Sequence, residues 1–186
     1  MDFEYLRYVS KEPDRGAILD ELMLAYGKDV WNYAYFLTRR RDLAEDIAQD
    51  VFVKVYQRLD SFRGASGIKP WLLTITRHTA LDYLKSAWMR RVTLLPSRFR
   101  QDALPSAEAV WFGREEQRTV WRAVMELPRK LREVLLLYAH HKLSIREIAE
   151  MLHLSEGTVK SRLHRARAAM NRRLGVRTTS REERRP

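Results

Sequence analysis

Apolar residues recur along most of this chain every three or four positions, which is the spacing of one face of an α-helix. Residues 18–39 carry the first such stripe, and residues 42–59 carry a second. A third begins at Pro70 and continues to about residue 91. No segment shows the sustained apolar and polar alternation that indicates a β-strand. The pattern predicts an all-α protein.

Glycine and proline positions divide these helices into groups. Residues 62–69 contain two glycines and a serine, which predicts a loop. Pro70 then starts a helix, because the first helical position needs no N–H donor. Residues 92–113 contain two prolines and no helical period, which predicts a flexible linker. We therefore expect two small helical domains, residues 1–91 and 114–175, followed by a disordered basic tail over residues 176–186.

The second domain contains two short helical stripes joined by a tight turn. Ser144 and Glu147 have the spacing of a capping box, in which each side chain satisfies a backbone N–H at the start of a helix. Ser155 is a good N-cap for the next helix. That helix has one apolar stripe, made of Val159, Leu163, Ala166 and Met170. The pattern predicts a helix-turn-helix over residues 144–173, whose second helix enters the major groove of DNA.

The outer face of this second helix carries the candidate DNA contacts. Four side chains are expected to face base edges: Lys160, Ser161, His164 and Arg165. Arginine is the most suited to a bidentate contact with guanine. Arg162 and Arg167 lie on the flanks and are expected to meet phosphates, which position a protein without specifying sequence. The alternative, a solvated basic helix in a bundle, does not account for the cap, turn and stripe in one register.

The charge distribution favours a polyanionic partner for the second domain. The chain has 35 lysines and arginines against 24 acidic residues, a net charge of +11. Residues 114–186 hold 18 of the basic residues and only 9 acidic ones, whereas residues 1–91 hold 15 and 13. Such an excess of positive charge is typical of proteins that bind nucleic acid. The nearly neutral first domain therefore needs a separate function.

The predicted helix over residues 42–59 has an acidic face. The side chains that share it are Asp42, Asp46, Gln49, Asp50 and Val53, with Glu45 beside them. Like charge repels phosphate, so this face does not bind nucleic acid. It is either a solubilising surface or a docking site for a basic protein partner.

Several classes of function find no support. Without cysteine there is no disulfide or thiolate metal site, and the adjacent His140 and His141 point to different helix faces, so we expect no metal and no cofactor. No apolar run reaches the roughly 18–20 residues that span a bilayer, and the charged N-terminus is unlike a signal peptide. No nucleophile sits in a catalytic setting. We expect a cytoplasmic protein that is not an enzyme, has no small-molecule substrate and does not insert into the membrane.

Three motifs in a fixed order resemble one family. They are D-L-A-E-D-I-A-Q-D-V-F (42–52), P-W-L-L-x-I-x-R (70–77) and S-E-G-T-V-K-S-R-L-H-R-A-R (155–167). Together they resemble the extracytoplasmic-function (ECF) sigma factors of bacteria, which hold only regions two and four of the sigma-70 family. The resemblance spans about residues 18–175. It implies a subunit that binds core RNA polymerase, at the β′ clamp helices and the β flap, recognises the −10 and −35 promoter elements and promotes transcription initiation.

The resemblance also assigns residues. The acidic helix matches region 2.2, which docks on the β′ clamp helices, and this implies polymerase contacts by Asp46, Gln49, Asp50 and Phe52. Phe52 either joins this contact or supports the helix from within. The loop 63–69 and helix 70–91 match the part that captures an extruded −10 base. The implied −10 residues are Arg63, Ser66, Lys69, Arg77, His78, Asp82 and Lys85.

The helix-turn-helix matches region 4.2, the reader of the −35 element. The implied −35 residues are Thr158, Lys160, Ser161, Arg162, His164 and Arg165. His78 departs from the asparagine that many members carry, and an imidazole cannot reproduce the pairing of an amide. The −10 sequence preference is therefore not transferred to this chain.

Two alternatives remain beside this reading. A helix-turn-helix regulator of another class, such as a response regulator, requires a receiver domain or ligand pocket upstream, and the first 91 residues lack the alternating strands of a receiver. A DNA-processing enzyme requires an activated nucleophile.

Many members of the resembled family are held inactive by an anti-sigma protein, which makes such a protein a candidate partner.

Overall fold

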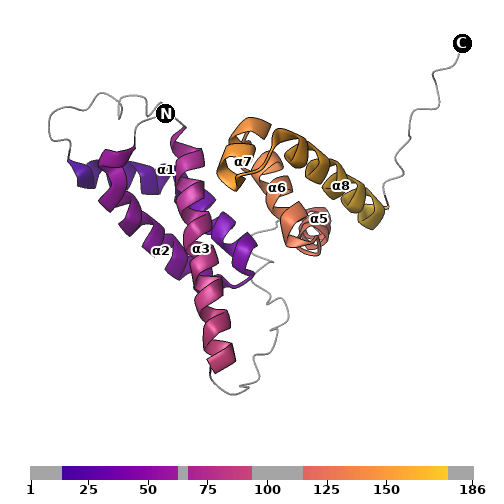
Figure 1. Cartoon of the computed structure of the whole chain (residues 1–186), viewed down its shortest axis with the longest axis horizontal. Helices are drawn as coiled ribbons and strands as arrows, with labels where there is room; N and C mark the ends of the chain where they lie inside the picture. Colours follow the sequence, from indigo (N-terminus) through magenta and orange to yellow (C-terminus); the bar gives the residue numbers. More distant parts are fainter. Residues whose placement is uncertain (1–13, 63–66, 94–114, 176–186) are drawn as a thin grey trace, which may run out of the picture. The chain divides into compact units, whose positions relative to one another are not determined.

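The computed structural model describes residues 14–62, 67–93 and 115–175. Contacts within the chain divide it into two units, residues 1–97 and 98–186 (Figure 1). Every regular element in the described ranges is helical, which confirms the predicted all-α class. Apart from its first two residues, the predicted linker 92–113 lies outside the described residues, as does the predicted tail 176–186. No helix in the described ranges is long and apolar enough to cross a membrane.

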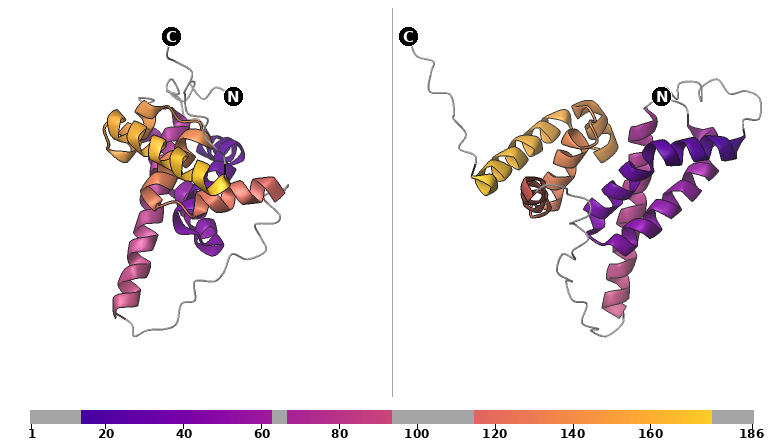
Figure 2. Two further views of the ribbon diagram at one scale, coloured as in Figure 1. Left: turned by 90° about the vertical axis from the view of Figure 1, so that its right-hand side faces the viewer. Right: turned by 180° about the vertical axis from the view of Figure 1, so that it is seen from behind.

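In the part of the N-terminal unit that the structure describes, three long helices pack against one another (Figure 2). Its elements are α1 (Arg15–Thr38), α2 (Arg41–Arg58), the short 3₁₀ helix η2 (Leu59–Ser61) and α3 (Ile68–Thr93). Tyr33 of α1, Ile47 of α2 and Leu72 of α3 are almost completely buried in this unit. Burial of such apolar surface, at roughly 25 cal/mol per Å², is what holds amphipathic helices together.

Helix α3 begins two residues earlier than the sequence predicts. Its first residue is Ile68 rather than Pro70, and the Trp71 N–H bonds the Gly67 carbonyl at 3.3 Å. The proline is tolerated because the N–H groups of the first helical turn have no partner within the helix. Pro70 therefore marks the first turn of α3 without being its first residue.

Within the described residues 115–175, the C-terminal unit has four helices. They are α5 (Glu115–Met125), α6 (Arg129–Ala139), α7 (Ile145–Leu152) and α8 (Glu156–Leu174), and α8 packs against the other three. Pro128 separates α5 from α6 and occupies the N-cap position of α6. The predicted apolar stripe of α8 is buried as a whole: Val159, Leu163, Ala166 and Met170.

The helix-turn-helix consists of α7 and α8. The predicted capping box is present: the Ser144 hydroxyl accepts from the Glu147 N–H at 3.2 Å, and Glu147 accepts from the Ser144 N–H at 2.7 Å. The chain then turns at His153, whose φ of 53° is left-handed. Ser155 caps α8 by accepting from the Thr158 N–H at 3.2 Å. These local bonds fix where each helix begins and how α8 leaves the turn.

Replacing Ser144 by alanine is expected to lower the free energy of unfolding of the C-terminal unit by about 1 kcal/mol, the usual effect of losing an N-cap hydroxyl. Urea unfolding followed by circular dichroism measures this change. Ser161→Ala is the matched control, because Ser161 is exposed within α8 and caps no helix. An equal loss in both variants would contradict a specific capping role for Ser144.

Candidate nucleic-acid interface

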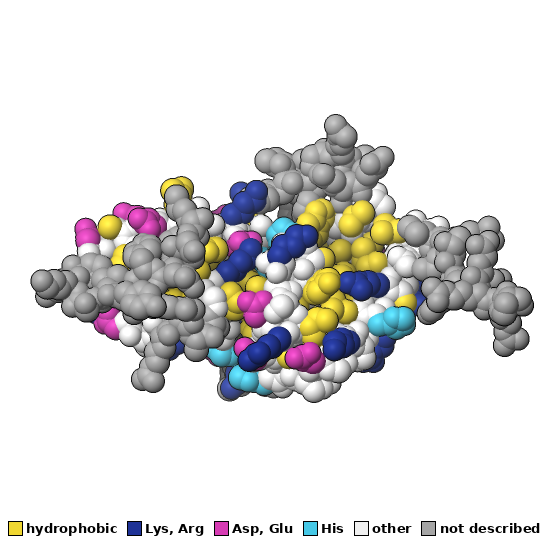
Figure 3. All heavy atoms as spheres, turned by 90° about the horizontal axis from the view of Figure 1, so that it is seen from above, with side chains coloured by type: hydrophobic (Ala, Val, Ile, Leu, Met, Phe, Trp, Pro, Cys, Tyr) yellow, Lys and Arg dark blue, Asp and Glu magenta, His cyan; other side chains and the backbone are white. Residues whose placement is uncertain are grey.

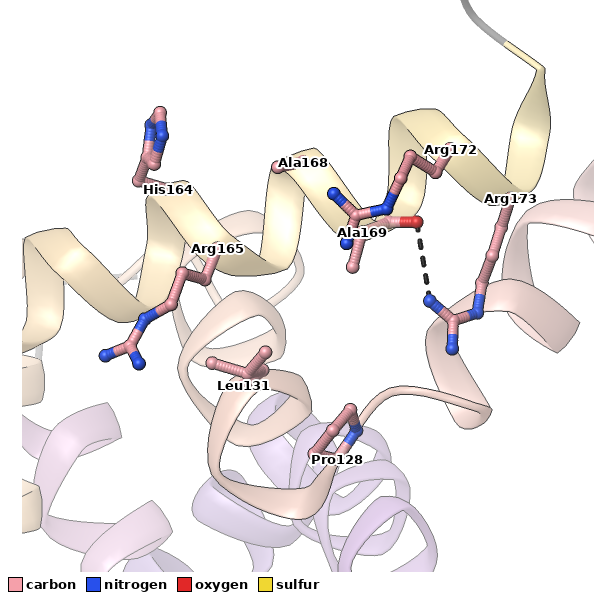
Figure 4. A pocket seen from close by; sticks show the side chains of 8 residues that line it. All are labelled: Pro128, Leu131, His164, Arg165, Ala168, Ala169, Arg172 and Arg173. Carbon is pink, nitrogen blue, oxygen red and sulfur yellow. Dashed lines mark hydrogen bonds between the residues drawn. The ribbon is translucent and has the colours of Figure 1, made fainter.

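The outer face of α8 is polar and basic, as the sequence predicts. Lys160, Ser161, His164 and Arg165 are all exposed, opposite the buried stripe of the same helix. Figure 4 shows His164 and Arg165 leaving α8 in different directions, beside a depression that Pro128 and Leu131 line from the α6 side. In the view of Figure 3, lysine and arginine side chains border hydrophobic ones on the same surface. The arrangement suits a helix that meets polyanionic DNA.

Hydrogen bonds on α8 orient some of these side chains. The Arg165 guanidinium donates from Nε to the Ser161 carbonyl at 3.3 Å and from an Nη to the Ser161 hydroxyl at 3.4 Å. Lys160 lies 3.7 Å from the Glu156 carboxylate one turn earlier. The Thr158 hydroxyl is 2.9 Å from that of Ser155. Arg165 is thus held along its own helix while its side chain stays exposed.

The two flanking arginines of α8 differ in their surroundings. Arg162 is half-buried. The Arg167 guanidinium lies 5.2 Å from the centre of the Tyr138 ring on α6, within the range of a cation–π contact. Sequence spacing does not reveal this contact, because Tyr138 belongs to another helix. Arg167 therefore also joins α8 to α6, in addition to its predicted phosphate contact.

The predicted −10 residues separate into groups. His78, Asp82 and Lys85 are exposed and share one face of α3, because they are four and three residues apart. Arg77 is half-buried and points about a quarter-turn away from them. Arg63 and Ser66 lie outside the described residues.

Lys69 has an acidic partner that the sequence does not predict. Its ammonium lies 2.8 Å from the Asp29 carboxylate of α1, and both side chains are mostly buried. The ion pair ties the first turn of α3 to α1. In this structure Lys69 therefore lies apart from the exposed face formed by His78, Asp82 and Lys85.

The acidic face of α2 is solvent-accessible. Asp46 and Gln49 are exposed, Asp50 is half-buried, and Val53 is 56% exposed beside them. Phe52 is only 6% exposed, so its ring packs into the core and supports α2 from within. At the start of the helix the Arg40 side chain hydrogen-bonds Asp42 and lowers the pKa of that carboxyl. The face therefore exposes acidic and amide side chains together with one apolar side chain, all of them accessible to a partner.

Two polar bonds join α2 to α3, one of them from the acidic face. The Tyr83 hydroxyl donates to Oδ2 of Asp50 at 2.7 Å, and the Lys54 ammonium donates to the Thr79 hydroxyl at 2.9 Å. The hydrogen bond to Asp50 is the main cause that raises the pKa of Tyr83 to about 12, with burial and the charges of Asp50 and Asp46 adding to it. No local sequence pattern points to Tyr83, because its partner lies 33 residues away along the chain.

Two family profiles cover most of these elements. Residues 22–90 match the family described as Sigma-70 region 2, and residues 117–170 match Sigma-70, region 4. The first match contains α2 with its acidic face, and the second contains α7 and all but the last four residues of α8.

Individual relatives extend over most of the chain. RNA polymerase sigma factor YlaC of Bacillus subtilis is 32% identical over 169 residues, which are 90% of this chain and 96% of that protein. ECF RNA polymerase sigma factor SigM of the same organism is 31% identical over 153 residues, 80% of this chain and 90% of that protein. These relatives share the N-terminal unit as well, which argues against a regulator that shares only the helix-turn-helix.

Solved structures of sigma factors are also similar to this chain. The sigma factor RpoE of Bartonella quintana, in complex with the anti-sigma factor NepR, has 25% sequence identity and a TM-score of 0.69, covering 85% of this chain and 97% of that one. CnrH, in complex with the cytosolic domain of CnrY, shares the fold at a TM-score of 0.64 and 23% identity, covering 93% of this chain and 94% of that one. The chain therefore belongs to the ECF sigma factors of the sigma-70 family, the DNA-binding subunits that direct RNA polymerase to promoters and start transcription.

Proposed function

We propose that this sigma factor binds core RNA polymerase through the acidic face of α2 and reads promoter DNA with α3 and α8. The observation that carries the proposal is the division of exposed charge: acidic side chains on α2 in one unit and basic ones on α8 in the other. Asp46, Gln49 and Asp50 bind the β′ clamp helices, and Phe52 holds α2 in place beneath them. In domain terms, residues 1–91 serve as region 2 and residues 114–175 as region 4, joined by the linker 92–113.

On α3, we assign the promoter contacts to exposed side chains that are polar or charged. His78, Asp82 and Lys85 face the −10 element from α3, with Arg77 at their flank. The resemblance adds three further residues to the proposed −10 set: Arg63 and Ser66, which lie outside the described residues, and Lys69, whose ion pair with Asp29 would have to open before it could contact DNA.

On α8, side chains that can reach base edges read the −35 element, and Arg162 contacts phosphate. The base-reading set is Lys160, Ser161, His164 and Arg165. Thr158, whose hydroxyl bonds the Ser155 cap, stabilises the start of that helix and lies beside the DNA backbone.

The remaining parts of the proposal concern partners and place of action. The protein acts as a specificity subunit without catalytic activity of its own, and it works in the bacterial cytoplasm, where core polymerase and the chromosome are. The β flap is a second polymerase contact. An anti-sigma protein is a further proposed partner, supported by the RpoE–NepR complex. A purified candidate that blocks binding to core polymerase tests this last assignment.

In vitro transcription tests the whole function. Core polymerase with and without this chain is incubated with a pool of genomic fragments, and RNA start sites are mapped. We expect starts that depend on the chain and that share two upstream sequence elements at a constant spacing. Starts without a shared element, or none above core polymerase alone, contradict the proposal.

DNA binding by the polymerase carrying this subunit is expected to weaken steeply with salt. Each phosphate contact made by lysine or arginine releases condensed counterions, so the logarithm of the binding constant falls linearly with the logarithm of salt concentration. Replacing Arg162 by alanine should reduce the slope by about one phosphate contact. Filter binding from low to moderate salt measures both slopes. An unchanged slope in the variant contradicts a phosphate contact by Arg162.

A further inference from the structure

The Asp50 carboxylate lies where the acidic face of α2 meets α3. It is half-buried and accepts a 2.7 Å hydrogen bond from the Tyr83 hydroxyl. Its exposed neighbours on the same face are Asp46, one helical turn before it, and Gln49. Asp50 is thus a member of the face that is hydrogen-bonded to the helix proposed to read the −10 element.

The kind of group that donates to Asp50 affects how well its carboxylate can bind a basic partner. A phenol hydroxyl is neutral, so it orients the carboxylate and leaves its negative charge intact. A carboxylate has about four acceptor positions, so one tyrosine leaves room for a further donor. A lysine or arginine in the same place would neutralise much of the charge that a basic partner seeks. A tyrosine hydroxyl is protonated at physiological pH, and the hydrogen bond to Asp50 raises the pKa of Tyr83 further, to about 12, so the hydroxyl stays a donor.

A second bond between the same helices provides a comparison. Lys54, one turn after Asp50 on α2, donates to the buried Thr79 hydroxyl at 2.9 Å. This bond also links α2 to α3, but it does not involve a residue of the acidic face. If the Tyr83 hydroxyl served only to join the two helices, loss of either bond should affect polymerase binding equally.

We propose that Tyr83 is a positioning residue for polymerase binding: its hydroxyl holds the Asp50 carboxylate in the orientation that the β′ clamp helices bind. This rests on the proposed role of the acidic face. Tyr83 does not touch the polymerase. Its hydroxyl restrains the Asp50 side chain, which would otherwise sample several rotamers. Tyr83 itself belongs to α3, the helix proposed to read the −10 element.

The test measures binding of the full-length chain, carrying a fluorescent label, to core polymerase by anisotropy. Tyr83→Phe removes only the hydroxyl, and we expect it to raise the Kd about 3- to 10-fold, the size of effect of losing one hydrogen bond of ordinary strength. Asp50→Glu keeps the charge but moves the carboxylate by one methylene, and it should weaken binding similarly. In a chain that already carries Asp50→Asn, Tyr83→Phe should have no further effect.

Thr79→Val is the matched control, because it removes the other bond between α2 and α3. It should leave the Kd unchanged, and thermal unfolding of every variant separates folding defects from binding defects. Transcription should fall for Tyr83→Phe at limiting protein and return to the wild-type level at saturation.

Three outcomes overturn the inference: a wild-type Kd for Tyr83→Phe or Asp50→Glu, an additive loss in the Asp50→Asn background, or an equal loss for Thr79→Val. If Asp50→Asn itself leaves the Kd unchanged, the proposed polymerase contact of Asp50 fails, and the inference fails with it; the double substitution of Asp46 and Asp50 then tests the rest of the face.

Discussion

Changing Asp46 and Asp50 together to lysine is expected to abolish assembly with core polymerase at concentrations where the wild-type chain saturates it. The substitutions place positive charge on a face proposed to meet a basic partner. Like charges brought together at an interface cost several kcal/mol, so the Kd should rise roughly a hundredfold or more. Asp50→Lys also removes the acceptor of the Tyr83 hydroxyl. Anisotropy with labelled full-length chain measures the loss.

The control must change the net charge equally without touching this face. Asp20→Lys with Glu21→Lys does so, because both residues are exposed on α1. We expect this variant to bind polymerase with less than a threefold change, the small effect of altering charges outside the contact at physiological salt, where screening acts over about 8 Å. An equal loss in both double variants would show that overall charge, and not the α2 face, determines binding.

Arg165→Ala is expected to relax recognition at one position of the −35 element. A bidentate arginine–guanine contact contributes about 1–3 kcal/mol of discrimination against the wrong base. Transcription from a promoter library randomised over the −35 element measures this preference position by position. The variant should lose its preference at a single base pair and keep the others.

Arg162→Ala is the matched comparison for this experiment. It removes the same charge from the same helix, but at a half-buried flank proposed to contact phosphate. All promoters in the library should weaken by a similar factor. If Arg165→Ala gives this uniform loss as well, Arg165 is a phosphate contact and the base-reading assignment is wrong.

Much of the fold could be predicted because its signals are local. The apolar stripe of α8 and the capping box at Ser144 each lie within a few residues of sequence, and the structure contains both. The start of α3 was missed by two residues, because a proline is compatible with any position in the first turn. The sequence did not decide whether Phe52 lies on the polymerase-binding face or in the core, because the acidic and apolar faces of this helix are adjacent.

The candidate sites were predictable only in part. Exposure of Lys160 and His164 follows from helical periodicity, since the opposite face is apolar. The partners of individual side chains do not follow, because they depend on how the helices pack. Lys69 finds Asp29 across 40 positions of sequence, and Tyr83 finds Asp50 across 33. Such pairs are set by tertiary structure, and no period or motif in one sequence encodes them.

The bonds between Arg165 and Ser161 have a consequence for how promoter preference changes. An arginine that is already restrained along its helix loses less conformational entropy when it binds a base. A substitution at Ser161 therefore changes the conformations that Arg165 adopts before it binds DNA, and it also changes the base contact proposed for Ser161. The two positions should behave as one unit, so their substitutions will be non-additive. A redesign of −35 preference will succeed sooner by varying both together than by varying each in turn.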